Sequence, residues 1–119
     1  RNNSEACKKY TDTPMWNSSL SAKIEPMLGA DKSSKDYVYL SPVEADSFTG
    51  LPPAYIETAK FDCLHDDGIL YAEKLRSAGI DVTLNETKGT IHGFDIMQKA
   101  PTTKSALEER IRFMKKYFD

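Results

Sequence analysis

The chain has 119 residues, enough for one domain, and its 16 basic and 18 acidic side chains nearly balance, which argues against nucleic acid as a partner. No apolar run approaches the roughly 20 residues that span a bilayer, so no membrane span is predicted. Cys7 and Cys63, the only cysteines, lack metal-type spacing and favour a reducing, cytoplasmic location over a disulfide framework. The chain begins at Arg1 without a secretory signal, which indicates trimming or a fragment.

The first fifty residues are polar and weakly periodic, so we expect an irregular segment with one helix. Asn17 is favoured at a helix N-cap, which predicts a helix from about Ser18. Pro26 should kink or end this helix, and Gly29 can terminate what remains. The apolar residues that recur at four-residue spacing are Leu20, Ile24 and Leu28.

From residue 51 onward the pattern is regular. The apolar run Ala54–Ala59, with prolines before it and charges after it, predicts a strand. Helical spacing then predicts a helix over Gly68–Ala78, which Gly79 stops. Apolar and polar residues alternate over Asp81–Glu86, as expected of a half-exposed strand.

A last helix is predicted to cover the sheet, beginning near Pro101 and a capping box formed by Ser105 and Glu108. Its apolar stripe consists of Leu107, Ile111, Met114 and Phe118. Strand, helix, strand and covering helix form a βαβ unit at the edge of a parallel sheet. We therefore predict an α/β fold and a single partial domain, with an irregular or helical segment over 1–50 and a βαβ-helix unit over 51–119.

Two residues suited to acid–base catalysis follow the predicted strands. Asp62 comes just after the first strand, and His92 comes after the second, between Gly89 and Gly93. Catalytic groups collect at the carboxyl ends of parallel strands, and neighbouring strands lie only about 5 Å apart. The two exit loops can therefore bring the carboxylate against the imidazole. In a catalytic triad the histidine is the general base, and the acid fixes its tautomer and stabilises the imidazolium.

Other interpretations stay open on spacing alone. An aspartate after a strand is more often a turn residue or helix cap, and a lone histidine is more often structural. Cys63 beside His65 suggests a thiol nucleophile, but adjacent side chains leaving a strand diverge. A metal site is disfavoured because no ligand pair has helix-face spacing. The residues that it would use are His65, Asp66, Asp67 and His92.

Four short motifs occur in order along the chain. They are Leu51-Pro52-Pro53-Ala54, Phe61-Asp62-x-Leu64-x-Asp66-x-Gly68, Tyr71-Ala72-x-x-Leu75-x-x-Ala78-Gly79 and His92-Gly93-Phe94. Together they resemble the carboxyl-terminal half of the hormone-sensitive-lipase-like esterases, a branch of the α/β-hydrolase fold. The resemblance covers about residues 37–94 strongly, and the motifs are specific as a set although no single one is.

The resemblance implies that Asp62 is the triad acid, that His92 is the triad base and that Asp66 has a structural role at a helix start. Cys63 departs from the proline usual in the family. The stretch Trp16–Leu28 matches the family's variable region, for which we expect a plain surface helix. The family's H-G-G-G and G-D-S-A-G motifs do not occur in the chain. Acyl transfer needs a nucleophile and an oxyanion hole, so we expect the chain alone to be inactive.

The leading hypothesis is part of a serine carboxylesterase that acts on a small ester and uses no cofactor. One alternative is a non-catalytic binding module of the same fold, which a missing upstream serine would indicate. Another is a peptidase or carbohydrate deacetylase of this fold. We also expect the chain to self-associate, because the strand at Ala54–Ala59 would expose an open edge.

Overall fold

Two parallel strands, β1 (Ala54–Ala59) and β2 (Val82–Thr87), form the sheet at the centre of the fold. The computed structural model describes residues 3–29 and 31–118. The strands pair in parallel along their whole length, from Ala54 opposite Val82 to Ala59 opposite Thr87. The predicted parallel sheet is confirmed: β1 has its predicted bounds, and β2 is shifted by one residue.

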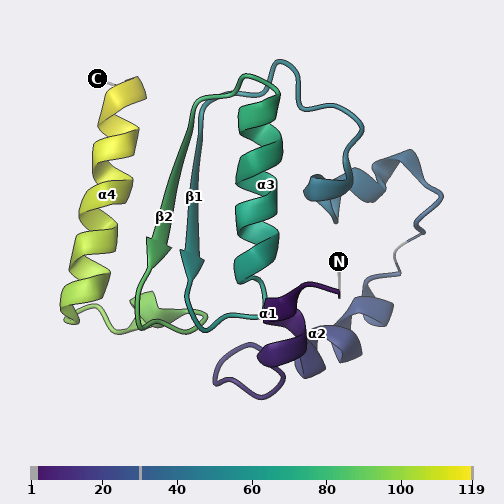
Figure 1. Cartoon of the computed structure of the whole chain (residues 1–119), viewed down its shortest axis with the longest axis horizontal. Helices are drawn as coiled ribbons and strands as arrows, with labels where there is room; N and C mark the ends of the chain where they lie inside the picture. The colour runs from purple at the N-terminus through teal and green to yellow at the C-terminus, as the bar shows by residue number, and fades with distance from the viewer. Residues whose placement is uncertain (1–2, 30, 119) are drawn as a thin grey trace.

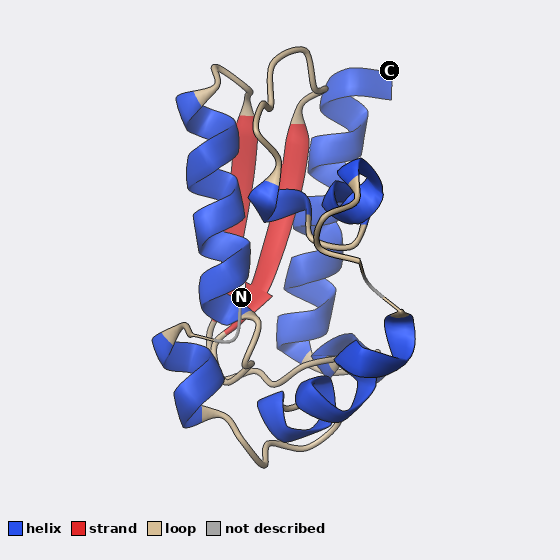
Figure 2. Cartoon of the chain, turned by 90° about the vertical axis from the view of Figure 1, so that its right-hand side faces the viewer, coloured by secondary structure: helices blue, strands red, loops and turns tan. Residues whose placement is uncertain are grey.

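Two long helices, α3 (His65–Ser77) and α4 (Pro101–Phe118), cover opposite faces of the sheet (Figures 1 and 2). Alternate side chains of β1 face the two helices. Thr58 faces α3, where a Cβ at Gly68 would lie only 2.5 Å from the Thr58 methyl group. Glycine at this position therefore lets α3 approach the sheet closely. Glu57, one residue earlier in β1, faces α4.

Helix α3 begins at His65, three residues before the predicted start at Gly68. Gly68 lies inside the helix because it serves the close approach to β1 and not a turn. Asp66 and Asp67 occupy the first turn, where the helix dipole favours negative charge. The residues of α3 that are buried most completely are Ala72 and Leu75.

Helix α4 begins at Pro101, as predicted, but the predicted capping box does not form its start, and Ser105 lies exposed in the second turn. Proline suits the first helical position because its missing N–H would have no partner there. The predicted apolar stripe does not pack on the sheet and is exposed, from 40% at Ile111 to 83% at Phe118. Thr103 and Ala106 are the buried residues of α4 instead.

The sheet face under α4 is polar, which explains why the predicted stripe turns away from it. Arg110 of α4 forms an ion pair with Glu57 of β1 and a second one, at 3.0 Å, with Asp95 in the loop after β2. Tyr55 and Asn85 donate hydrogen bonds to Glu57 at 2.8 and 3.2 Å. Burial alone would raise the pKa of Glu57, but the hydrogen bonds and charge of Arg110 outweigh it and lower the pKa. Arg110 thus ties α4, β1 and the loop after β2 together.

The amino-terminal segment contains α1 (Glu5–Lys9) and α2 (Ser18–Ile24). The predicted start of α2 is confirmed, since the Asn17 side chain accepts a hydrogen bond from the backbone N–H of Leu20 at 2.9 Å. Helix α1 was not predicted because five residues are too few to show a periodic pattern. It lies at the amino end of α3 (Figure 1), where Ala6 N–H donates to Asp66 at 2.8 Å.

Short 3₁₀ helices complete the described part of the chain. Gly29 ends the first of them in the left-handed region, with φ of 59°, as predicted. The 3₁₀ helix at Pro42–Glu44 is held against α3, because Lys74 Nζ donates a hydrogen bond to the carbonyl of Val43 at 2.7 Å. No described helix combines the length and apolar character needed to cross a membrane. The four 3₁₀ helices are η1 (Glu25–Leu28), η2 (Lys35–Tyr39), η3 (Pro42–Glu44) and η4 (Phe94–Ile96).

Replacing Arg110 with leucine is expected to destabilise the fold, because Glu57 would be left buried without its cation. A third of the Arg110 side chain is exposed, so the loss should fall near or below the lower end of the about 3–5 kcal/mol that breaking a fully buried pair costs. Urea unfolding followed by circular dichroism measures the change. Arg112→Leu is the matched control, since Arg112 is 70% exposed and pairs with Glu109 in its own helix. Equal stability of the two variants would contradict the role of Arg110.

Candidate active site

Asp62 and His92 lie in direct contact at the carboxyl end of the sheet. Asp62 Oδ2 is 2.8 Å from His92 Nδ1, and Asp62 Oδ1 accepts a hydrogen bond from the backbone N–H of Leu64 at 2.9 Å. An ionised carboxylate can only accept, so a neutral imidazole in this pair carries its proton on Nδ1 and leaves Nε2 as an acceptor. The Asp62 side chain is 10% exposed and that of His92 is 40% exposed. The predicted proximity is confirmed, whereas the catalytic roles stay a prediction.

The loops that carry this pair are joined where the two strands end. Phe61 N–H donates to the carbonyl of Thr90 at 2.8 Å, which extends the pairing of the strands into the loops. The hydroxyl groups of Thr87 and Thr90 are hydrogen-bonded at 2.6 Å, and both residues are buried. Gly93 has φ of 68°, a conformation that favours glycine and lets the backbone turn directly after His92.

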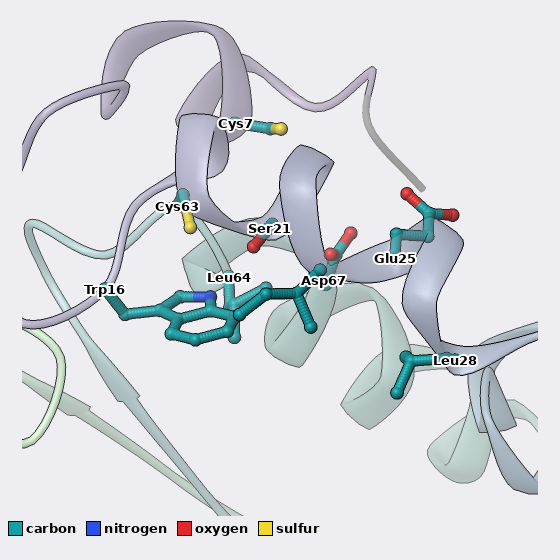
Figure 3. Close-up of a pocket in the computed structure, with 9 residues that line it drawn as sticks. Cys7, Trp16, Ser21, Glu25, Leu28, Cys63, Leu64 and Asp67 are labelled. Atoms are coloured by element: carbon teal, nitrogen blue, oxygen red, sulfur yellow. The ribbon is translucent and has the colours of Figure 1, made fainter.

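Two cavities lie on either side of the loop that follows Asp62. One, of about 330 Å³, opens beside the Asp62–His92 pair and extends along β1 toward Tyr71. The other, of about 110 Å³, lies between this loop and α2 (Figure 3). Leu64 and Asp67 line both cavities and thus separate them. The apolar residues that line the smaller cavity are Trp16, Ile24, Leu28 and Leu64.

The site includes a residue that the sequence did not indicate. Trp16, expected to belong to a plain surface helix, precedes α2 and contacts His92, with ring centroids 6.0 Å apart and ring planes 34° apart. That expectation was wrong for Trp16. A lone tryptophan in a polar segment is the one available signal, because nothing in the spacing links positions 16 and 92.

The alternative interpretations of Cys63 and His65 find little support. Cys63 is 2% exposed, and burial, followed by the neighbouring Asp62 charge, raises the pKa of its thiol to about 11. His65 Nδ1 is hydrogen-bonded to Asp66 at 2.9 Å and so has its own partner. Within the described ranges, no group of three or more potential ligands is arranged to hold a metal ion.

Comparison with known proteins identifies the fold family. A family model described as an alpha/beta hydrolase fold matches residues 1–96. The chain belongs to this family. A solved thermostable esterase from Pseudomonas putida superposes with a TM-score of 0.82 at 30% identity, covering 92% of this chain and 36% of that one. A bacterial heroin esterase superposes with a TM-score of 0.77 at 29% identity, again covering 92% of this chain and 36% of that one.

Curated relatives of this α/β hydrolase are also ester hydrolases by name. Neutral cholesterol ester hydrolase 1 of Rattus norvegicus is 44% identical over 62 residues, which are 52% of this chain and 15% of that protein. Carboxylesterase NlhH of Mycobacterium tuberculosis is 49% identical over 55 residues, which are 46% of this chain and 17% of that protein. The predicted resemblance to hormone-sensitive-lipase-like esterases is thereby confirmed. The matched stretches cover only 15% and 17% of the length of these two relatives.

The raised pKa of Cys63 predicts slow alkylation of this α/β hydrolase at neutral pH, because the thiolate is the reactive form. In a Cys7→Ser variant, iodoacetamide should modify Cys63 at pH 8 roughly 100-fold more slowly than the same chain in urea, the factor that two pKa units give. The rate in the folded protein should keep rising toward pH 11. A rate that levels off near pH 9, as for an ordinary thiol, would contradict the prediction.

Proposed function

We propose that the chain supplies the acid and the base of a serine carboxylesterase. The observation that carries the proposal is the 2.8 Å contact between Asp62 and His92 at the ends of neighbouring parallel strands. The esterases that the chain resembles in sequence and in fold support it. The chain has no G-x-S-x-G motif, so the nucleophilic serine and the oxyanion hole belong to other residues of the proposed enzyme.

The two residues would act as follows. His92 Nδ1–H donates to Asp62, which leaves Nε2 ready to accept the proton of the serine hydroxyl as its oxygen attacks the ester carbonyl. Asp62 then stabilises the imidazolium that forms. The imidazolium returns the proton to the departing alcohol, and a water molecule, activated by the same Nε2, releases the acid from the acyl-enzyme.

The surroundings of the pair suit a small ester. A cavity of about 330 Å³ is at the lower end of the size of common ligand pockets, roughly 300–1,000 Å³. The smaller cavity is largely apolar and, at about 110 Å³, is smaller than the roughly 150 Å³ engineered cavity that holds benzene. Short substituents on the ester therefore fit best.

In the proposed enzyme, His92→Ala and Asp62→Asn are each expected to lower ester turnover roughly 10⁴-fold, by the serine-protease precedent. A p-nitrophenyl acetate assay measures the loss, and the isolated chain should show only background hydrolysis. His65→Ala is the matched control, since the His65 side chain is hydrogen-bonded to Asp66 and not to the Asp62 carboxylate. Full turnover in a folded His92→Ala variant would refute the assignment and favour a binding module or another reaction of this fold.

We further propose that the isolated chain self-associates. In the described sheet β1 pairs with β2 alone, and α4 leaves an apolar stripe exposed. Open edges and apolar patches both promote association. Light scattering should show the mean mass rising with concentration. The double variant Leu107→Glu/Ile111→Lys keeps α4 helical, because Glu and Lys four residues apart form a stabilising ion pair. Association should weaken in this variant if it occurs through the apolar stripe. Unchanged association would indicate that the β1 edge is responsible. A concentration-independent monomer mass would contradict the proposal.

A further inference from the structure

We propose that Trp16 is a positioning residue that holds the His92 ring in the orientation its reaction requires. The inference rests on the proposed function, because it gives His92 the role of general base. It concerns the turn formed by residues 13–17, which links α1 to α2. This turn contacts both His92 and the residue that follows it.

The backbone of the turn is held in a conformation that costs energy. Met15 has φ of 72°, and no other non-glycine residue within the described ranges has a positive φ. Three hydrogen bonds enforce it: Trp16 N–H to the Pro14 carbonyl at 2.9 Å, the Thr13 hydroxyl to the Trp16 carbonyl at 2.9 Å, and the Asn17 amide to the Thr13 carbonyl at 3.0 Å. Such strain persists where the surroundings over-determine it, and it concentrates at functional sites.

The strained turn directs two consecutive side chains at the His92 loop. The indole of Trp16 lies 6.0 Å from the His92 imidazole, centroid to centroid, with 34° between the planes. The terminal methyl group of Met15 lies 3.6 Å from the point where a Cβ of Gly93 would be. The turn therefore packs against the loop from one side, while Asp62 binds the ring at Nδ1.

One hydrogen bond does not fix an imidazole ring. The χ2 torsion of histidine is broad, and a ring held only at Nδ1 can still tilt about that bond. The His92 side chain is 40% exposed, so the remaining packing around it is incomplete. The indole supplies a second constraint on the plane of the ring. With both constraints in place, the direction of Nε2 is defined.

Packing stability alone does not account for a tryptophan at this position. Its Nε1 is buried and has no hydrogen-bond partner in the described part of the chain. Burying an unsatisfied donor is unfavourable, and a phenylalanine would avoid this penalty. Figure 3 shows the indole beside Leu64, at the loop that carries Asp62. The wide aromatic face thus connects the turn with both loops of the proposed site.

The first test uses the ¹⁵N-labelled 119-residue chain, whose two histidines, His65 and His92, give separate imidazole signals in NMR. Wild-type protein should show NOEs between the Trp16 and His92 rings, and their absence would overturn the proposal. In Trp16→Leu the Nδ1 proton of His92 should exchange faster and broaden, with His65 unchanged as the internal reference. Trp16→Phe should retain the His92 signal, because the aromatic face is kept. An unchanged His92 signal in a folded Trp16→Leu variant would also overturn it.

The second test measures turnover in the proposed enzyme. Misplacing a catalytic group by about 1 Å can cost 10²-fold, so Trp16→Leu should lower kcat roughly 10–100-fold with KM within about twofold, and Trp16→Phe should restore most of the loss. A raised KM with unchanged kcat would make Trp16 a substrate contact and overturn the positioning role. If the wild-type protein hydrolyses no ester, the proposed function fails, while the NMR test still decides whether Trp16 orients His92.

Discussion

The parallel pairing of β1 with β2 is the constraint on which the site depends. Six residue pairs bring the carboxyl ends of both strands to one edge, and the Phe61–Thr90 hydrogen bond carries the pairing into the exit loops. Asp62 and His92 lie thirty positions apart in sequence, yet each needs only a short loop to reach the other. A shift in register would move one loop along the sheet and separate carboxylate from imidazole, whatever the loop sequences were.

The two faces of the sheet are covered by different kinds of contact, and both help to hold these loops. On the α3 face the contact is close and apolar, with Gly68 against Thr58. On the α4 face it is polar, and Arg110 joins Glu57 of the strand to Asp95 of the loop. Asp95 is only three residues beyond His92, so the ion pairs that anchor α4 also limit how far the His92 loop can move. Because this face of the sheet is polar, the apolar side of α4 does not pack on it and stays exposed to solvent.

The features that sequence patterns predicted are those set by local periodicity or by short motifs. Both strands, α2, α3 and the proximity of Asp62 to His92 belong to this group. The side that α4 buries could not be predicted, because the polarity of the facing sheet decides it. Helix α1 is too short for a pattern, and Trp16 acts through a contact 76 positions away in sequence. Its role depends on how the amino-terminal segment folds back onto the sheet.

Asp66, the second aspartate of the motif that contains Asp62, holds the amino-terminal segment against the rest of the fold. Asp66 accepts hydrogen bonds from His65 and from the backbone of Ala6, and these two contacts lower the pKa of its carboxyl group. Helix α1 is thereby fixed at the amino end of α3. The Tyr10 ring then packs edge-on against Phe61, at 6.2 Å, and the Tyr10 carbonyl accepts from Ser18 N–H.

Only seven residues lie between Tyr10 and Ser18, whose backbones are hydrogen-bonded, so the chain must turn sharply between them. Met15, with its positive φ, lies in this turn. Trp16 is brought to His92 as a result. One acid of the motif thus binds the histidine directly. Asp66 fixes the amino-terminal segment, and the turn of that segment places Trp16 against the same His92 ring. Two aspartates four residues apart therefore act on one imidazole, one directly and the other through the amino-terminal segment.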